Sequence, residues 1–309
     1  MCFVNRINLM LKIAFTPIYC HPLPENHRFP MAKYELLPQQ LRYEGTVTDE
    51  NFFTPTPLTE EDLLRVHKED YWHRLQLGKL TKKEERATGF PWSIDLVERE
   101  VTINGGTIDT ALYALRFGCS FNIAGGTHHA FGDRGEGFCL LNDIAIASAY
   151  LLHHQLAQKI LVIDLDVHQG NGTAKIFENT QSVFTFSMHG GNNYPLRKEK
   201  SDLDIPLPDK ADDKLYLGIL QETLPKLFDE VEPDFVFYQS GVDILATDKL
   251  GRLGVSIAGC KERDRLVFQH CKQDNIPVAV SMGGGYSPQL SHIIEAHANT
   301  YRMAQSLFF

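Results

Sequence analysis

Short apolar runs rich in β-branched and aromatic residues alternate along this chain with longer stretches of amphipathic pattern. The runs predict strands, and they cover residues 13–16, 121–124, 160–163, 183–186, 235–238 and 278–280. The longer stretches predict helices, and they cover residues 60–77, 94–117, 142–153, 214–228, 258–271 and 289–306. Near-continuous apolar strands separated by helices are typical of a parallel sheet covered on both faces.

The pattern predicts a single α/β domain over residues 1–309, because no internal repeat, low-complexity tract or linker divides the chain. Its expected architecture is an open, mostly parallel sheet with helices on both faces. Residues 29–57 are rich in Pro and less regular, so we expect irregular structure there, near the rim of a site. Residues 1–9 precede the first predicted strand, and we expect them to be a dispensable N-terminal extension.

Composition narrows the possible partners. A net charge of −9 argues against direct binding of nucleic acid, which needs clustered Lys and Arg, and it is compatible with lysine-rich or polyamine substrates. The six cysteines are scattered and never form CxxC, which indicates a reduced, cytoplasmic protein without a disulfide framework. No apolar run approaches the roughly 18 residues of a membrane span.

Polar side chains follow four of the predicted strands, at the edge where open α/β sheets bind ligands. They are His128 and His129 after 121–124, Asp164, Asp166 and His168 after 160–163, Asp243 after 235–238, and Tyr286 after 278–280. Four such coincidences predict one site.

The sequence Asp164-Leu165-Asp166-Val167-His168 alternates polar and apolar residues. If its backbone stays extended, the polar three project from one side and the apolar two enter the core. Charges at the end of a buried strand need a compensating partner, and a divalent metal supplies one. Asp166, His168 and Asp243 offer three ligands and leave a position open for water, as catalytic zinc requires. The same ligand types also suit Fe(II) or Mn(II), and a lone DxD is often only a turn.

Two adjacent histidine pairs occur in the chain. His128-His129 lies on a loop flanked by glycines, which favours a catalytic role, whereas His153-His154 lies in a helical pattern without glycines or nearby acids and is expected to be inert. Amide hydrolysis needs a base for the water, a proton for the leaving amine and a donor for the oxyanion. Asp164 and Asn171 are candidates for orienting one imidazole each.

Tyr286 follows three consecutive glycines, which permit unusual backbone angles. Its phenol could donate a hydrogen bond to a carbonyl oxygen that becomes an oxyanion. A Gly-Gly-Gly-Tyr segment is also compatible with a plain turn, and as a phosphate cradle it lacks the Lys and Ser/Thr of a P-loop.

These motifs resemble the histone deacetylase superfamily over nearly the whole chain. The matching stretches are GGTHHAF (125–131), GEGFCLLND (135–143), DLDVHQGNG (164–172), GVD (241–243) and GGGY (283–286). The form of these stretches, with GFPWS (89–93), is most similar to the class IV branch and its bacterial homologues.

The resemblance implies a role for each matching residue. It implies that Asp166, His168 and Asp243 bind zinc, that His129 is the general base and acid, and that Tyr286 stabilises the transition state. His128 matches the electrostatic partner near the substrate carbonyl, with Asp164 and Asn171 bonded to His128 and His129. The channel that holds the lysine chain would be lined by Phe138, Gly137, Leu250 and Tyr194. A potassium ion would be held beneath the zinc by Asp164 and Ser187, among others.

The function that the resemblance implies is zinc-dependent hydrolysis of N-acyl-lysine in a protein or peptide. Deacylation of an acylated small amine, such as an acetylated polyamine, is an alternative on the same fold. A non-catalytic acyl-lysine binder is a third reading, and the complete set of His128, His129 and Tyr286 favours catalysis over it. An arginase-like site with two manganese ions needs further carboxylates, whereas Gln169 and Asn171 follow His168 here.

Overall fold

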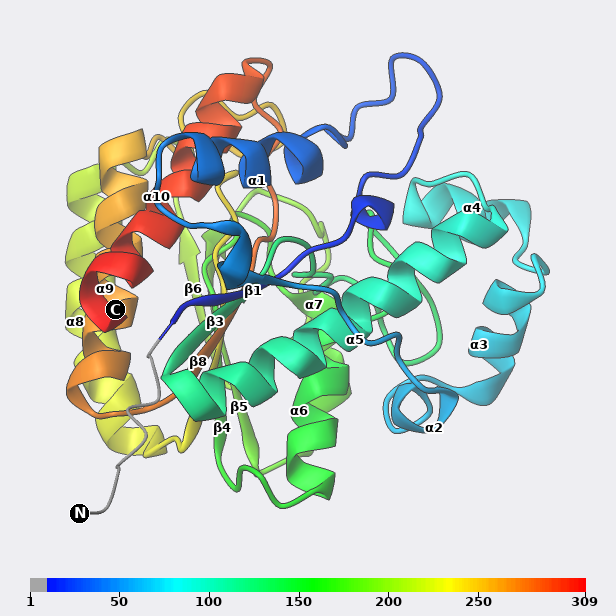
Figure 1. Ribbon diagram of the computed structural model, residues 1–309, viewed down its shortest axis with the longest axis horizontal. Helices are drawn as coiled ribbons and strands as arrows, with labels where there is room; N and C mark the ends of the chain where they lie inside the picture. Colours follow the sequence, from blue (N-terminus) through cyan, green and yellow to red (C-terminus); the bar gives the residue numbers. More distant parts are fainter. Residues whose placement is uncertain (1–9) are drawn as a thin grey trace.

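The computed structural model describes residues 10–309, and within them eight strands form one sheet in the order β2-β1-β3-β8-β7-β4-β5-β6 (Figure 1). All seven strand pairs are parallel. The strands are β1 (Lys12–Ala14), β2 (Phe52–Phe53), β3 (Cys119–Asn122), β4 (Ile160–Asp164), β5 (Val183–Gly190), β6 (Leu203–Leu207), β7 (Phe235–Gln239) and β8 (Val278–Ser281). The predicted open parallel sheet is confirmed.

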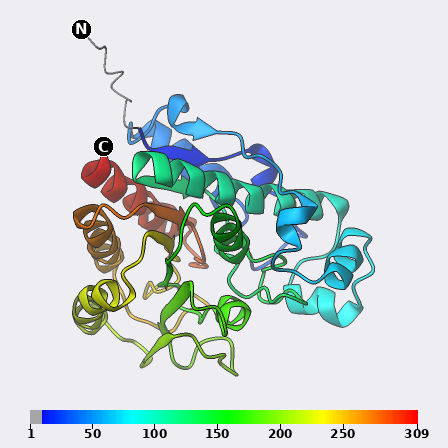
Figure 2. The ribbon, with the colours of Figure 1, turned by 90° about the horizontal axis from the view of Figure 1, so that it is seen from below.

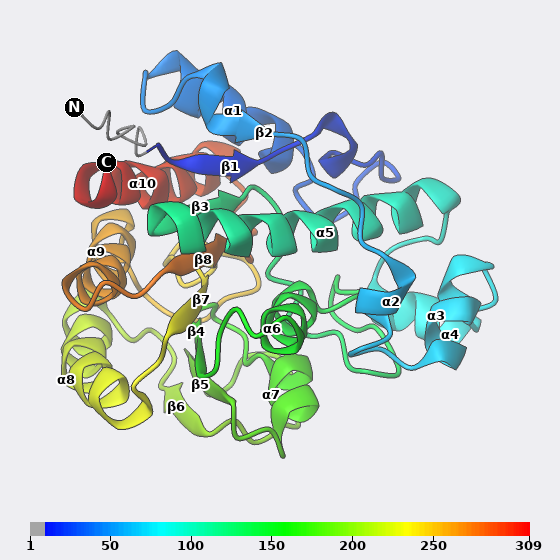
Figure 3. The same ribbon diagram turned by 60° about the horizontal axis from the view of Figure 1, so that its bottom comes forward.

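Helices cover both faces of this sheet. In Figure 3, α8, α9 and α10 lie on one face and α5, α6 and α7 on the other, and Figure 2 shows the same two layers from below. The helices are α1 (Lys33–Tyr43), α2 (Glu60–Leu63), α3 (Glu69–Gln76), α4 (Lys82–Thr88), α5 (Ile94–Phe117), α6 (Asp143–His153), α7 (Asn171–Phe177), α8 (Asp213–Val231), α9 (Ile257–Gln273) and α10 (Leu290–Phe308). Helix α1 packs on α10 near the edge of the sheet that β2 and β1 form. Helices α2, α3 and α4 lie near the beginning of α5.

The long helices begin where side chains can accept the free N–H groups of the first turn. Ser93 accepts from the backbone N–H of Leu96 at the start of α5, and Asn142 does the same for Ala145 at α6. The central strands β4, β7 and β8 are buried along their whole length, as expected for strands with helices on both sides. Among the described helices, none is long and apolar enough to cross a membrane.

Several predicted elements need correction. The helix predicted over residues 60–77 is in fact two helices, α2 and α3. The chain between them turns so that His67 is buried, and the ring of His67 accepts a hydrogen bond from the backbone N–H of Asn142 (3.0 Å). Residues 29–57, predicted to be irregular, contain α1 and β2. In α1 the side chains of Tyr34, Leu37 and Leu41 are buried at helical spacing, and Pro38 lies inside the helix.

Helices α4 and α7 were not predicted, since each is short and carries few apolar residues in a clear period. Strand β6 was also not predicted: its apolar residues alternate, but Asp204 and Pro206 interrupt them, and Pro is disfavoured within a strand. The proposed extension at residues 1–9 lies outside the described residues. The condition that residues 164–168 stay extended is not met, because β4 ends at Asp164 and the chain bends at 166–168. Leu165 and Val167 are nevertheless fully buried, as predicted.

The strand order explains why distant motifs meet. Strands β3, β8, β7 and β4 are consecutive neighbours in the parallel sheet, so the loops that follow their carboxyl ends lie side by side. Those four loops carry the histidine pair, Tyr286, Asp243 and the DLDVH segment.

Candidate active site and metal centre

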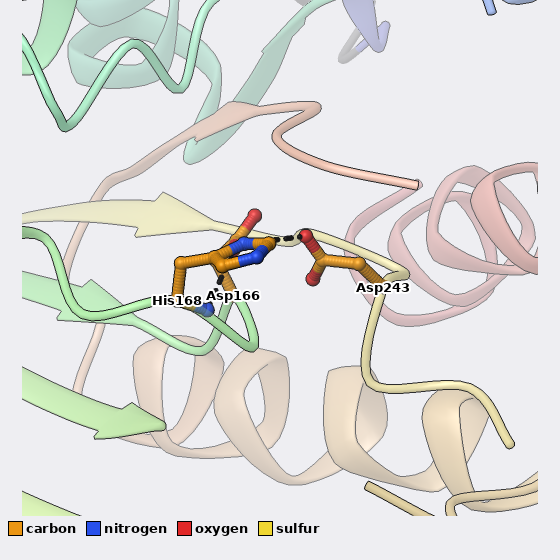
Figure 4. Close-up of side chains that lie close together, drawn as sticks. All are labelled: Asp166, His168 and Asp243. Carbon is orange, nitrogen blue, oxygen red and sulfur yellow. Dashed lines mark hydrogen bonds and ion pairs between the residues drawn. The ribbon is translucent and has the colours of Figure 1, made fainter. Parts of the chain in front are cut away.

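Two loops bring together Asp166, His168 and Asp243, the side chains predicted to bind metal. Asp166 and His168 follow β4 and Asp243 follows β7, and Figure 4 shows His168 placed against both carboxylates. The Nδ1 atom of His168 lies 3.0 Å from Asp166 Oδ1 and 3.2 Å from Asp243 Oδ2. One donor atom from each residue lies within 4.8 Å of the others, and within residues 10–309 no other three His, Cys, Asp or Glu side chains form such a group.

The surrounding backbone fixes both carboxylates. The backbone N–H of Gly284 donates to Asp166 Oδ2 (2.9 Å), and that of Val167 donates to Asp243 Oδ1 (2.9 Å). A Cβ atom on Gly284 would lie 2.0 Å from Asp243 Oδ2, so only glycine lets the loop after β8 close over the two carboxylates. The ligand candidates are therefore held in place by three separate loops.

The electrostatics of this group fit a divalent cation. Burial and the neighbouring Asp166 raise the pKa of Asp243 to about 7, and hydrogen bonds to the two carboxylates raise the pKa of His168 to about 10 against the effect of its burial. Two buried carboxylates thus share the proton of one imidazole. Apart from the His168 Nδ1 atom at 3.2 Å, Asp243 Oδ2 has no polar partner among the described residues. A metal ion would displace the proton and satisfy this oxygen.

The two adjacent histidines lie beside this group and have different partners. His128 Nδ1 is bonded to Asp164 Oδ2 (2.7 Å), and His129 Nδ1 is bonded to Asn171 Oδ1 (2.6 Å). Both pairings match those that the resemblance to the histone deacetylases implied. Each imidazole is 4% exposed, and the two ring centroids lie 4.0 Å apart.

The partners push the two histidine pKa values apart. Burial lowers the pKa of both imidazoles, but the charges of Asp164 and Asp166 outweigh it at His128 and raise that pKa above its usual value. At His129, burial and the nearby His128 and His168 hold the pKa well below its usual value. His129 is therefore neutral at pH 7, whereas Asp164 and Asp166 favour the cationic form of His128, which is the arrangement expected of a base with an electrostatic partner.

A neutral His129 has one free lone pair. Because Asn171 Oδ1 accepts a hydrogen bond at Nδ1, that nitrogen carries the proton and Nε2 is left as the acceptor. His129 lines both a cavity of about 390 Å³ and a smaller space of about 40 Å³ beneath it. The base candidate thus borders the space that a substrate would enter.

Tyr286 lines both of these spaces as well, from the loop after β8. Its backbone N–H donates to Asp248 Oδ2 (2.6 Å). Burial, together with Asp243 and Asp166, raises the pKa of the phenol well above its usual value. The hydroxyl therefore keeps its proton and can act as a hydrogen-bond donor.

The predicted channel residues all line the outer cavity. Phe138 and Tyr194 contribute aromatic rings, Leu250 lies on the same cavity, and Gly137 places backbone against His129. Gly137 has φ +55°, and a Cβ there would lie 2.7 Å from His129 Cδ2. Tyr194 meets the His129 ring edge to face, with centroids 4.9 Å apart. Ser187, the predicted potassium contact, is buried next to Asp164 in the β4–β5 register and bonds to His189 (3.0 Å).

The second histidine pair lies elsewhere. His153 and His154 are exposed at the end of α6 and line neither space. This placement agrees with the prediction that they are inert.

Asp143 holds the loop that carries the two histidines, and its position in the sequence predicted no role for it. Its Oδ1 accepts the backbone N–H (2.8 Å) and the hydroxyl (2.8 Å) of Thr127, and its Oδ2 accepts the N–H of Gly126 (3.1 Å). The hydroxyls of Thr107 (2.8 Å) and Ser281 (2.9 Å) also donate to Oδ2. The residue ends the GEGFCLLND stretch and lies at the start of a predicted helix, and these two features were the only indications of its importance.

Lys33 and Arg263 are two further buried residues that hold the site loops. The Lys33 ammonium donates to the carbonyl of Gly283 (3.1 Å) and lies 5.6 Å from the Tyr286 ring centroid, and burial lowers its pKa to about 8. Arg263 donates to the carbonyls of Leu165 (3.3 Å) and Ser240 (3.1 Å), which precede the metal-binding candidates. Neither lies in a motif, so only the tertiary structure reveals them.

A buried group of Asp166, His168 and Asp243 that could hold a metal lies beside a histidine pair at the carboxyl edge of a parallel sheet, and this fold is similar to that of the deacetylases. A crystal structure of a histone deacetylase homologue complexed with SAHA is similar, with a TM-score of 0.83 and 25% sequence identity over 96% of this chain and 84% of that one.

Sequence comparisons give the same result. The family model described as the histone deacetylase domain matches residues 27–301, and the chain belongs to this family. An uncharacterized protein of Picosynechococcus sp. is 45% identical over 96% of this chain and 99% of its own length. Histone deacetylase 2 of Arabidopsis thaliana is 29% identical over 87% of this chain and 72% of its own length. Membership implies hydrolysis of the deacetylase type.

Proposed function

We propose that this protein hydrolyses the amide bond of N-acyl-lysine in proteins or peptides, with zinc bound by Asp166, His168 and Asp243. The observation that carries the proposal is the neutral His129, whose free Nε2 borders the same cavity as His168 and the Tyr286 phenol. The likeness of its motifs to the class IV branch, and the scattered free cysteines, support a cytoplasmic deacylase of that branch.

Zinc, when bound, would polarise the acyl carbonyl and acidify a water molecule. The remaining chemistry comes from the side chains of this protein. His129 Nε2 accepts the proton of the attacking water and then returns it to the leaving lysine amine. His128, whose cationic form Asp164 favours, stabilises the negative charge that develops beside it. The Tyr286 hydroxyl donates to the carbonyl oxygen as it becomes an oxyanion.

The channel residues position the substrate. Phe138 and Tyr194 present aromatic faces to the aliphatic chain of lysine, and Leu250 lines the same cavity. Gly137 lets the acyl-lysine lie close to backbone next to His129. Asp164 and Ser187 would also contribute to a potassium site, which would fix the loop after β4 from below.

The competing functions have less support. A two-metal, arginase-like site would need a second cluster, and Gln169 instead donates to the Glu199 carbonyl (2.7 Å) and to Asp204 (2.8 Å). A non-catalytic binder would not need the hydrogen bond between His129 and Asn171, which leaves Nε2 of His129 free to accept a proton. Fe(II) suits the same ligands as zinc, so metal analysis of the active protein must accompany the assay.

The test is acyl release by the purified, zinc-loaded protein. Peptides with acetyl-lysine or long-chain acyl-lysine and N-acetylated polyamines would be supplied with and without chelator. Chelator-sensitive release from peptides is the expected result. Release from polyamines alone would replace the proposal with a small-molecule amidohydrolase, and no release from any substrate with zinc bound would refute it in favour of a binder.

A further inference from the structure

The entrance of the channel carries two arginines that the proposed mechanism does not use. Arg28 and Arg86 both line the outer cavity of about 390 Å³, together with Phe138 and Tyr194. Both arginines are exposed, and within residues 10–309 neither guanidinium forms an ion pair. The Arg28 guanidinium carbon lies 4.9 Å from the centroid of the Phe138 ring, which is one wall of the channel.

The backbone beside each arginine is fastened to the channel wall. The N–H of Gly137 donates to the carbonyl of Ala87 (2.9 Å), and the N–H of Phe138 donates to that of Thr88 (2.8 Å), so the end of α4 is joined to the wall next to Arg86. The ring of His27, adjacent to Arg28, bonds to the Gly89 carbonyl (2.9 Å). The two guanidinium groups therefore extend from one connected assembly at the entrance.

One carboxylate also lines this cavity, and it is already engaged. Glu136 accepts a hydrogen bond from Arg134 Nε (2.8 Å) and another from the Tyr194 hydroxyl (2.8 Å). Arg134 thus offsets the negative charge of Glu136, and the positive charges of Arg28 and Arg86 are left without a counter-charge in the cavity lining. The entrance is locally cationic although the whole chain has a net charge of −9.

We propose that Arg28 and Arg86 form a carboxylate-binding rim that selects acyl-lysine flanked in sequence by Asp or Glu. A guanidinium presents several N–H donors in a fork that matches a carboxylate, and it stays charged at any physiological pH. The remaining amines of an acetylated polyamine are cationic, and the rim repels them. This inference rests on the proposed function, because it describes how the same channel selects its substrate.

The experiment compares kcat/KM for capped peptides of equal length that place Asp, Asn or Lys on both sides of one acetyl-lysine, alongside an N-acetylated polyamine. The wild-type protein should favour the Asp peptide over the Asn peptide by about three- to tenfold, through KM. The preference should shrink when ionic strength is raised from about 0.05 M to about 0.5 M, because exposed charges are screened.

Substitutions of the two arginines test whether the rim causes the preference for the Asp peptide. Arg28→Gln and Arg86→Gln should each lower the ratio of Asp to Asn peptide, and the double variant should bring it close to one. Arg116→Gln is the matched control, since this exposed guanidinium also lies 4.9 Å from an aromatic ring, that of Phe117, but on α5 and outside the cavity. It should keep the wild-type ratio.

Equal rates on the three peptides, or a faster rate on the Lys peptide or the polyamine, would overturn the inference while leaving hydrolysis established. If no peptide is cleaved, the proposed function fails, and the rim is still tested by fluorescence anisotropy of labelled peptides. Tighter binding of the Asp peptide that is lost in the double variant would uphold the rim, and equal binding would refute it.

Discussion

The floor and the entrance of the channel use charge in different ways. At the floor His128, His129 and Asp166 are at most 4% exposed, and their partners are buried with them. At the entrance Arg28 and Arg86 are exposed and form no ion pair in the described part of the chain. Buried charges are strongly coupled, so they fix protonation states, whereas exposed charges are screened and only bias which ligand binds.

This difference gives a general test. A change at the floor should lower kcat by the same factor on every peptide, because the lost interaction acts on the reacting amide. A change at the rim should alter the ratio between acidic and neutral peptides through KM.

His129→Gln removes the proposed base. We expect kcat to fall by about 10²- to 10⁴-fold, equally on the Asp and Asn peptides. His154→Gln is the matched control, since that residue belongs to an adjacent histidine pair but is exposed at the end of α6. Steady-state kinetics on both variants provide the measurement, and a loss confined to one peptide would show that the floor also selects substrates.

Tyr286→Phe removes one hydroxyl and leaves the ring in place. The proposed oxyanion donor is lost, so kcat should fall by about 10²- to 10³-fold. Zinc content, measured by elemental analysis, should stay at the wild-type level because the phenol is not among the ligand candidates. Unchanged turnover would refute the role given to Tyr286.

Asp143→Asn tests whether the histidine loop must be held by a carboxylate. The new amide group would face the donors that now bond to Asp143, so the loop should shift, and kcat should fall by up to about 10²-fold on all peptides. The matched control is Asp234→Asn, whose carboxylate accepts two backbone N–H groups (2.7 and 3.0 Å) at the opposite ends of the strands.

Circular dichroism and zinc content separate positioning from unfolding in this experiment. A folded, zinc-loaded Asp143→Asn protein with reduced kcat would show that the carboxylate positions the histidines. Full activity in that protein would contradict this role.

The floor could be predicted from the sequence, since each of its residues follows an apolar run that forms one of four neighbouring strands. The pairing of His129 with Asn171 followed from the family motif. The entrance could not be predicted, because Arg28 lies in a segment without periodicity and α4, which carries Arg86, is too short and polar to produce one. Lys33 could not be predicted for a related reason, because Pro38 and its neighbours led us to expect irregular structure where α1 forms.

Asn171→Asp should have the smallest effect, and it acts on the pH profile. His129 works as a base only when neutral, and its pKa now lies well below the usual value because of burial and the neighbouring His128 and His168. A carboxylate at 171 favours the protonated imidazole, so the pKa of His129 should rise. His129 would then become protonated at a higher pH, and the acid limb of the kcat/KM profile should shift to higher pH by about one unit.

Asn179→Asp adds the same charge to an exposed position beyond the end of α7 and should leave the acid limb in place. If His129 is the base whose protonation limits the rate, only the change at 171 moves the limb, and it moves equally for the Asp and Asn peptides because the rim is untouched. An unmoved limb in Asn171→Asp would mean that another group limits the rate at low pH.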